Sequence, residues 1–112
     1  MNFSEKVYSL LKKVPKGKVT TYSALARAAG SPRAARAVGT LMRKNPNPDK
    51  IPCYKVVLSD GRIGNYSGPG GVFRKQALLS KDGIAISPGG RIRILARTSS
   101  RFEYHFAVAK SL

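Results

Sequence analysis

The chain has 112 residues, and its 21 Lys and Arg against 5 Asp and Glu give a formal net charge of +16. This length allows one domain with a modest core and excludes two, and a hydrophobic content of 42% excludes a wholly disordered chain. Because the basic residues are interleaved with segments of ordinary folded composition, nucleic acid is favoured as the partner over an acidic membrane surface. We expect no membrane association, since no run approaches the ~20 apolar residues of a membrane span.

Cysteine and histidine each occur once, as Cys53 and His105. This excludes the usual spacings of zinc ligands, and we expect neither a metal nor a cofactor. A single cysteine fits a reducing compartment, and the first residues contain no signal-peptide core. We therefore expect a cytoplasmic protein.

The first helix is predicted from apolar residues at helical spacing between Phe3 and Leu11. Ser4 can cap it, because a serine hydroxyl accepts a hydrogen bond from the first helical turn. Val14-Pro15 should end the helix, since the residue before a proline avoids helical geometry.

Two further short helices are predicted on either side of a tight turn. Thr20 or Thr21 can cap a helix over residues 22–29. The run Gly30-Ser31-Pro32 ends that helix and starts the next, which should extend from Pro32 to about residue 44 with Ser31 as its cap. Two short helices joined by a glycine-containing turn are typical of a helix-turn-helix motif.

The second helix of this motif carries Arg33 and Arg36 among small side chains. Small side chains permit close approach to a groove of nucleic acid, and arginine can reach phosphates or bases. A helix packed through its alanines would explain residues such as Ala35, but not Gly39-Thr40 beside the arginines. The pattern therefore predicts a DNA-recognition helix.

The rest of the chain predicts short strands and one more helix. Residues 54–58 should form a strand that ends in the turn Ser59-Asp60-Gly61, and residues 84–86 and 92–94 should form a two-stranded ribbon. A helix is expected over residues 73–80. Its side chains expected to face the core are Phe73, Ala77 and Leu78. These elements predict a mainly α fold with small β elements, similar to a winged helix-turn-helix domain.

Cys53 follows Pro52 and precedes an apolar run. Taken alone, such a cysteine is either a small buried hydrophobe or a nucleophile. The cationic chain and the upstream recognition helix favour the nucleophile. The glycine-rich segment 64–71 surrounds Tyr66 and lacks the Lys-Ser/Thr of a phosphate-binding P-loop.

Several short motifs follow one another in a specific order. They are Val14-Pro15-Lys16-Gly17, Thr21-Tyr22, Ala34-Ala35-Arg36-Ala37-Val38-Gly39, Asn45-Pro46, Ile51-Pro52-Cys53, Gly64-Asn65-Tyr66-Ser67-Gly68, and Leu78-Leu79 before Gly83. In this order they closely resemble the active-site domain of O6-alkylguanine-DNA alkyltransferases over about residues 3 to 87. The resemblance implies that residues 1–90 form a domain that transfers an alkyl group irreversibly from O6 of guanine in double-stranded DNA to Cys53.

The resemblance also implies roles for individual residues. The domain would enter the minor groove and flip the guanine out, with Tyr22 helping to rotate the nucleotide and Arg36 filling the gap. Asn45 would tie the helix-turn-helix to the active-site strand. The other expected DNA contacts are Ser23, Arg33, Ala35 and Gly39. The expected base pocket consists of Met42, Val56, Gly64, Tyr66, which would donate to the purine, and Ser67, which would face the damaged oxygen.

Two positions depart from the family pattern of a histidine that relays the thiol proton to a glutamate. Tyr54 stands at the histidine position and Asp82 at the glutamate position. A phenol, with a reference pKa of about 10, is a poor base at neutral pH, although it can hold a water and pass a proton. The implied catalytic set is therefore Cys53, Tyr54, Asp82 and Asn45, with Lys55 as a further source of positive charge. We expect a slower reaction or an altered pH profile.

Two other functions remain open. One is a damage-flagging relative that binds the same lesions without repair, against which Cys53 argues, and the other is a winged-helix regulator. Residues 91–112 are a basic, aromatic extension that is either a DNA-contacting ribbon, a helix that closes the core, or the start of a fused domain. We expect the repair domain to act as a monomer.

Overall fold

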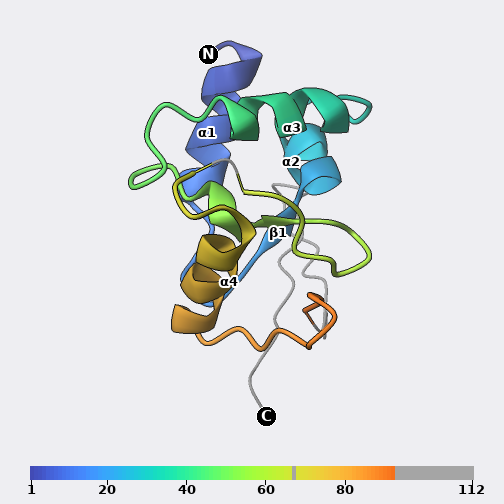
Figure 1. The fold of residues 1–112 in the computed structure, drawn as a ribbon. Coiled ribbons are helices and arrows are strands. Elements are labelled where there is room, and N and C mark those ends of the chain that lie inside the picture. Colours follow the sequence, from blue (N-terminus) through green and yellow to red (C-terminus); the bar gives the residue numbers. More distant parts are fainter. Residues whose placement is uncertain (67, 93–112) are drawn as a thin grey trace.

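The computed structural model describes residues 1–66 and 68–92, and this part of the chain is mainly helical, as the sequence predicts. Its elements are α1 (Phe3–Lys12), β1 (Thr20–Thr21), α2 (Tyr22–Ala28), α3 (Ala35–Arg43), a 3-10 turn (Cys53–Lys55), β2 (Val56–Val57) and α4 (Gly71–Lys81). Figure 1 shows α1, α2 and α3 grouped together, with α4 apart from them and β1 between. The expected extension lies outside the described residues beyond position 92.

Helix α1 begins with a capping box formed by Asn2 and Glu5. The Asn2 side chain accepts from the Glu5 amide at 2.9 Å, and the Glu5 carboxylate accepts from the Asn2 amide at 3.2 Å. The prediction of Ser4 as the cap was wrong, because this reciprocal pair satisfies two backbone donors at once. Val7 and Leu11 are the buried residues of α1, and the predicted end before Pro15 is confirmed.

The helix-turn-helix consists of α2 and α3, which pack against each other. Thr21 caps α2 as predicted, accepting from the Ala24 amide at 3.1 Å. Helix α3 begins at Ala35 and not at Pro32, so the prediction of Ser31 as its cap was wrong. Residues 31–34 instead form a separate turn, closed by a backbone bond from the Ala34 amide to the Ser31 carbonyl at 2.9 Å.

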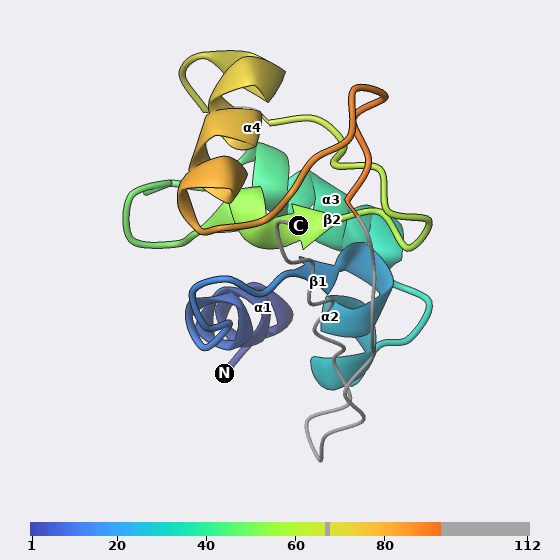
Figure 2. The same cartoon turned by 90° about the horizontal axis from the view of Figure 1, so that it is seen from below.

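The strands β1 and β2 are parallel, with Thr20 opposite Val56. Figure 2 shows them side by side, with α1 and α2 on one side and α3 and α4 on the other. The strand predicted over residues 54–58 is shorter than expected, because the chain winds into the 3-10 turn before it becomes extended. The predicted turn that follows is confirmed, and the Gly61 amide closes it by donating to the Leu58 carbonyl at 2.9 Å.

Helix α4 presents a different face to the core than the sequence predicts. Its buried residues are Lys75 and Leu79, whereas Phe73 is 79% exposed and Ala77 is also exposed. Leu78 is only half-buried. The expected inward face was therefore wrong, because the Lys75 ammonium finds backbone carbonyl partners inside the molecule.

The core consists of two clusters. The first joins the helix-turn-helix to α1 and includes Cys53 and Val56. The second lies beneath α4 and contains Val19, Val57, Ile63, Leu79, Ile84 and Ile92. The predicted ribbon is present as an antiparallel bridge between Ile86 and Ile92, while residues 93 and 94 lie outside the described part.

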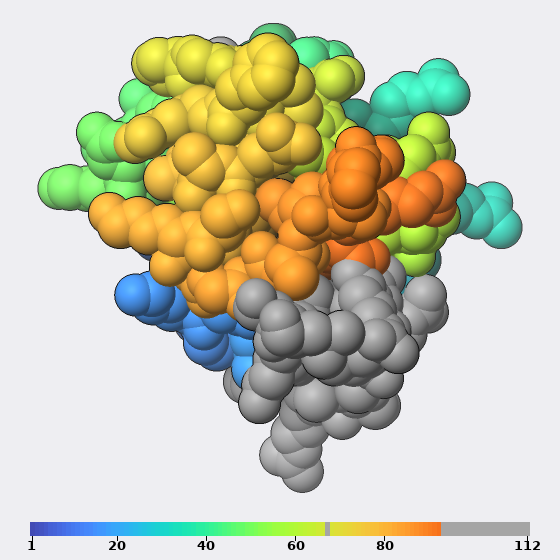
Figure 3. Space-filling model, turned by 60° about the horizontal axis from the view of Figure 1, so that its bottom comes forward, coloured from blue at the N-terminus to red at the C-terminus, as the bar shows by residue number. Residues whose placement is uncertain are grey.

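Among the described residues, those in front in Figure 3 belong largely to α4 and to the chain that follows it towards residue 92. Within the described residues, no helix combines the length and apolar character needed to cross a membrane.

Replacing Gly61 by alanine should destabilise the fold more than the same change at Gly30. Both have positive φ, +95° and +87°, so each substitution forces a strained backbone that costs about 1–2 kcal/mol. A Cβ at residue 61 would also lie 2.8 Å from the Ile92 carbonyl oxygen, whereas nothing lies within 4 Å of one at residue 30. Urea unfolding of both variants checks this, and equal losses would contradict the tight approach at Gly61.

Candidate active site and nucleic-acid interface

Cys53 lines a pocket of about 280 Å³ between the helix-turn-helix and the glycine-rich loop. Its thiol is free, and the residue is 5% exposed. The residues around the pocket are Tyr22, Gly39, Met42, Arg43, Cys53, Leu58, Gly64, Asn65 and Tyr66. The structure thus brings the cysteine together with three residues expected to form the base pocket, namely Met42, Gly64 and Tyr66. Ser67 lies outside the described residues.

Asn45 connects the end of α3 to the chain that leads into Cys53. Its side-chain amide donates to the Ile51 carbonyl at 2.8 Å, and its side-chain oxygen accepts from the Asn47 amide at 3.0 Å. The same Ile51 carbonyl accepts from the Cys53 amide at 2.8 Å. The geometry therefore matches the tie between recognition helix and active-site segment that was expected of Asn45.

Tyr54 and Asp82 meet directly. The Tyr54 hydroxyl donates to Asp82 Oδ2 at 2.6 Å, which joins the 3-10 turn to the C-terminal end of α4. Burial raises the pKa of Tyr54 strongly, and the hydrogen bond to Asp82 and the charge of that carboxylate add to the effect. The phenol consequently stays protonated at neutral pH and donates its proton in the hydrogen bond to the carboxylate.

Lys55 is directed away from the pocket. Its ammonium donates to the Val14 carbonyl at 2.8 Å, and the residue is 7% exposed. Burial lowers the pKa of Lys55. Lys55 thus holds the other side of the 3-10 turn against the end of α1, and it does not line the thiol pocket.

Two phenols of the pocket are held in their protonated form. Burial raises the pKa of Tyr22 and of Tyr66, and in both cases negative charge on Cys53 raises it further. A protonated phenol can donate a hydrogen bond to a ligand in the pocket. Both tyrosines are therefore suited to act as donors beside the thiol.

Lys75 is a neighbour of the pocket that sequence reasoning missed. Its ammonium donates to the Val56 carbonyl at 2.7 Å and to the Asn65 carbonyl at 3.1 Å. The carbonyl of Val56, a residue expected in the base pocket, thus already has one partner. The apolar pattern of α4 gave no sign that Lys75 is buried. Lysine is almost never buried without specific partners, and its partners here are carbonyls in distant parts of the chain.

A second hollow, a groove of about 350 Å³, adjoins the pocket and shares with it Tyr22, Gly39, Arg43 and Leu58. The other residues that line the groove are Ser23, Ala35, Arg36 and Ser59. It thus gathers all the expected DNA contacts except Arg33, which borders a separate hollow over residues 31–34. Arg43 was missed, although its spacing of four residues from Gly39 puts both on one face of α3.

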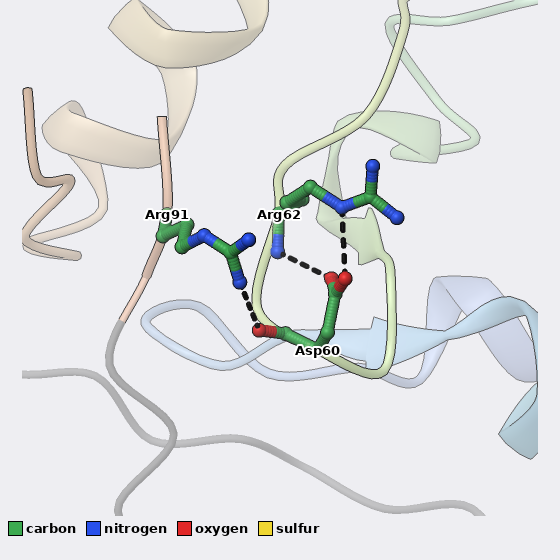
Figure 4. A network of polar contacts seen from close by, with 3 residues as sticks. All are labelled: Asp60, Arg62 and Arg91. Carbon is green, nitrogen blue, oxygen red and sulfur yellow. Dashed lines mark hydrogen bonds and ion pairs between the residues drawn. The ribbon is translucent and has the colours of Figure 1, made fainter. Parts of the chain in front are cut away.

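The turn that borders this groove is held by a small polar network (Figure 4). Arg62 Nε lies 2.8 Å from Asp60 Oδ2, and Arg91 Nη1 donates to the Asp60 carbonyl at 3.2 Å. The backbone hydrogen bond from Arg62 is the main cause of the lowered pKa of Asp60. Because these side chains are exposed, the ion pair shapes the turn more than it stabilises the fold.

Residues 2–84 match the family described as the DNA-binding domain of 6-O-methylguanine DNA methyltransferase. A bifunctional methyltransferase/endonuclease of Thermoplasma volcanium is 49% identical over 83 residues, which are 74% of this chain and 26% of that protein. The methylated-DNA–protein-cysteine methyltransferase of Rattus norvegicus is 54% identical over 78 residues, which are 70% of this chain and 37% of that protein.

Among solved structures, Mycobacterium tuberculosis OGT in complex with DNA has a TM-score of 0.68 and 35% identity, covering 73% of this chain and 49% of that one. The chain spans between about a quarter and somewhat over a third of the two curated relatives. The family match extends from the capping box of α1 to the segment after Asp82, and so includes the thiol pocket and the groove. The chain therefore belongs to the 6-O-methylguanine DNA methyltransferase family, whose DNA-binding domain it contains.

Proposed function

We propose that this protein repairs DNA directly, by irreversible transfer of an alkyl group from O6 of guanine in double-stranded DNA to Cys53. The observation that carries this proposal is the position of a free thiol in a pocket that shares a wall with the groove beside Arg36. The relatives named as methylated-DNA–protein-cysteine methyltransferases support the same chemistry.

The geometry requires the damaged base to leave the duplex. Cys53 is 5% exposed, so its sulfur cannot reach a base that remains stacked. Extrusion of a base costs a few kcal/mol, least for a damaged one. Arg36 is exposed on α3 at the groove, where it can enter the stack from the minor groove and fill the gap.

The transfer itself is a nucleophilic displacement. The Cys53 thiolate attacks the alkyl carbon, a sulfur–carbon bond forms, and the carbon–oxygen bond breaks with its electron pair left on guanine. The protonated Tyr66 phenol supplies the proton that lets guanine leave as a neutral molecule, and it regains a proton from water. The thioether on Cys53 has no route back to a thiol, so each protein molecule reacts once.

Tyr54 and Asp82 act here as a positioning pair. The Tyr54 hydroxyl keeps its proton and donates a hydrogen bond to Asp82, and the raised pKa of the phenol prevents it from acting as a base at neutral pH. Their hydrogen bond instead fixes the turn that carries Cys53 to the end of α4.

We further propose that residues 1–90 act as a monomeric repair domain in the cytoplasm of a prokaryote, associated with its nucleoid. Met42, Val56, Gly64 and Ser67 would complete the base pocket, and Ser23, Ala35, Gly39 and Arg33 would contact DNA. The groove beside Arg36 and the net charge of +16 support binding to duplex DNA.

Incubation with a duplex that carries one O6-methylguanine should add one methylene to the intact mass of the protein. The gain should map to the peptide containing Cys53 and should be absent from Cys53→Ser, which keeps its affinity for DNA. Mass spectrometry of both proteins provides the measurement. An unchanged mass with retained lesion-selective binding would assign the protein to the damage-flagging class.

Arg36→Ala should slow the transfer by at least about tenfold but weaken DNA binding only slightly, because one cationic contact among many contributes little to affinity. Lys6→Ala is the matched control, since it removes an exposed positive charge from α1, outside the pocket and the groove. Single-turnover rates and fluorescence anisotropy separate the two effects. Equal transfer rates for the two variants would exclude the gap-filling role of Arg36.

Tyr54→Phe should lower stability by about 1.5–3 kcal/mol, the usual contribution of a hydrogen bond to a charged group. It should leave the shape of the pH profile of transfer unchanged between about pH 6 and 9, where the wild-type phenol stays protonated. Asp82→Asn is the companion variant, because it keeps an acceptor oxygen but removes the charge. A pH profile altered by Tyr54→Phe would show that Tyr54 relays a proton.

A further inference from the structure

Lys75 is buried with its charge beside the reactive pocket. The residue is 1% exposed, and its ammonium donates to the carbonyls of Val56 and Asn65. Removing an ammonium from water is costly even when it is hydrogen-bonded, and an apolar side chain of similar size would avoid that cost. The presence of a cation at this position therefore calls for a reason other than packing.

The carbonyl partners place this charge at the wall of the pocket. Val56 follows the 3-10 turn that begins with Cys53, and Asn65 itself lines the pocket. A Cβ built on the lining residue Gly64 would lie 3.8 Å from the Lys75 ammonium and 3.7 Å from the Tyr22 hydroxyl. The ammonium thus lies next to Gly64, one of the residues that line the pocket.

The residues next to Cys53 in the chain do not supply this charge. Tyr54 is neutral and bound to Asp82, and the Lys55 ammonium is bound to the Val14 carbonyl. The titratable groups that line the pocket beside Lys75 are the Cys53 thiol, the phenols of Tyr22 and Tyr66, and the guanidinium of Arg43, which belongs to α3 and borders the groove as well.

We propose that Lys75 is the positioning cation for Cys53, and that its fixed ammonium offsets the negative charge on sulfur until the alkyl carbon has been attacked. This inference rests on the proposed function. The thiol proton leaves to water, the sulfur–carbon bond forms, and the carbon–oxygen bond breaks with its electron pair on guanine, which takes a proton from Tyr66. Lys75 keeps its proton throughout.

The proposal has a consequence for the spent protein. Burial lowers the pKa of Lys75 to about 8, while negative charge on Cys53 works in the opposite direction. A thioether is neutral, so alkylation removes the interaction that raises this pKa. The Lys75 ammonium should therefore titrate at lower pH in the alkylated protein, whereas a lysine too distant to interact with charge on Cys53 would keep its titration midpoint.

The test uses iodoacetamide as a DNA-independent probe, because Cys53 is the single cysteine of the chain. The rate at which iodoacetamide alkylates Cys53 is followed by intact mass between about pH 6 and 9 for the wild type, Lys75→Gln and Lys75→Arg. Glutamine keeps two donors for the carbonyls without charge, and arginine keeps the charge. We expect at least about a tenfold slower reaction at neutral pH for Lys75→Gln, and a rate near wild type for Lys75→Arg.

A second measurement needs no variant to fold. The 13C resonance of the Lys75 side chain is titrated in the wild type before and after Cys53 has been carboxamidomethylated, and its midpoint should move to lower pH. An unmoved midpoint, or a Lys75→Gln variant with the wild-type rate and pH profile, would overturn the proposal. If the rate of reaction with iodoacetamide depends on Lys75 but no methyl group is taken from DNA, the proposed repair function fails and this inference stands. If methyl transfer occurs and neither reaction depends on Lys75, this inference alone fails.

Discussion

The position of Cys53 depends on the hydrogen bonds that hold one short turn. A 3-10 turn of three residues has little stability of its own, so its geometry comes from its partners. Asn45 fixes the chain before the turn, Tyr54 binds Asp82 at the end of α4, and Lys55 binds a carbonyl after α1. Because these bonds reach three separate parts of the fold, the thiol can be nearly buried and still line the pocket.

The same turn lies where the two core clusters meet. Val56 packs with the helix-turn-helix cluster, and the next residue, Val57, packs with the cluster beneath α4. Successive side chains of a strand point to opposite faces, so a strand of two residues is enough to join the two clusters. Helix α3 and the glycine-rich loop are thereby held so that both line one pocket.

In the proposed function, attraction to DNA and chemistry at the thiol would draw on different charges. The chain has a net charge of +16, and charge at an exposed surface acts at long range and is screened by salt. The two buried lysines, Lys55 and Lys75, are instead fixed by backbone carbonyls and are shielded from salt. In the proposed function, the overall charge would govern encounter with DNA, while a single buried ammonium would influence the sulfur without altering affinity.

Much of this protein could be predicted from the sequence because the signals are local. Thr21 was predicted as a cap because its hydroxyl needs only the amide three residues on. The ordered motifs around Cys53 and Tyr66 located the pocket, and the spacing of α2 and α3 located the helix-turn-helix. The predicted helix starts were wrong where two neighbouring residues could each cap the helix or begin it. Asn2 caps α1 in place of Ser4, and the turn over residues 31–34 moves the start of α3 to Ala35.

Only the tertiary structure decided which face of α4 points inward and which acceptor the Tyr54 hydroxyl binds. The first depends on carbonyls of Val56 and Asn65, which are 19 and 10 residues from Lys75 in the chain. The second depends on Asp82, which is 28 residues away. Helical periodicity describes neighbours within a few turns, so it contains no information about such partners. The sequence by itself thus determined the chemistry available to this domain, and the packing of distant segments decided which charges lie beside the thiol.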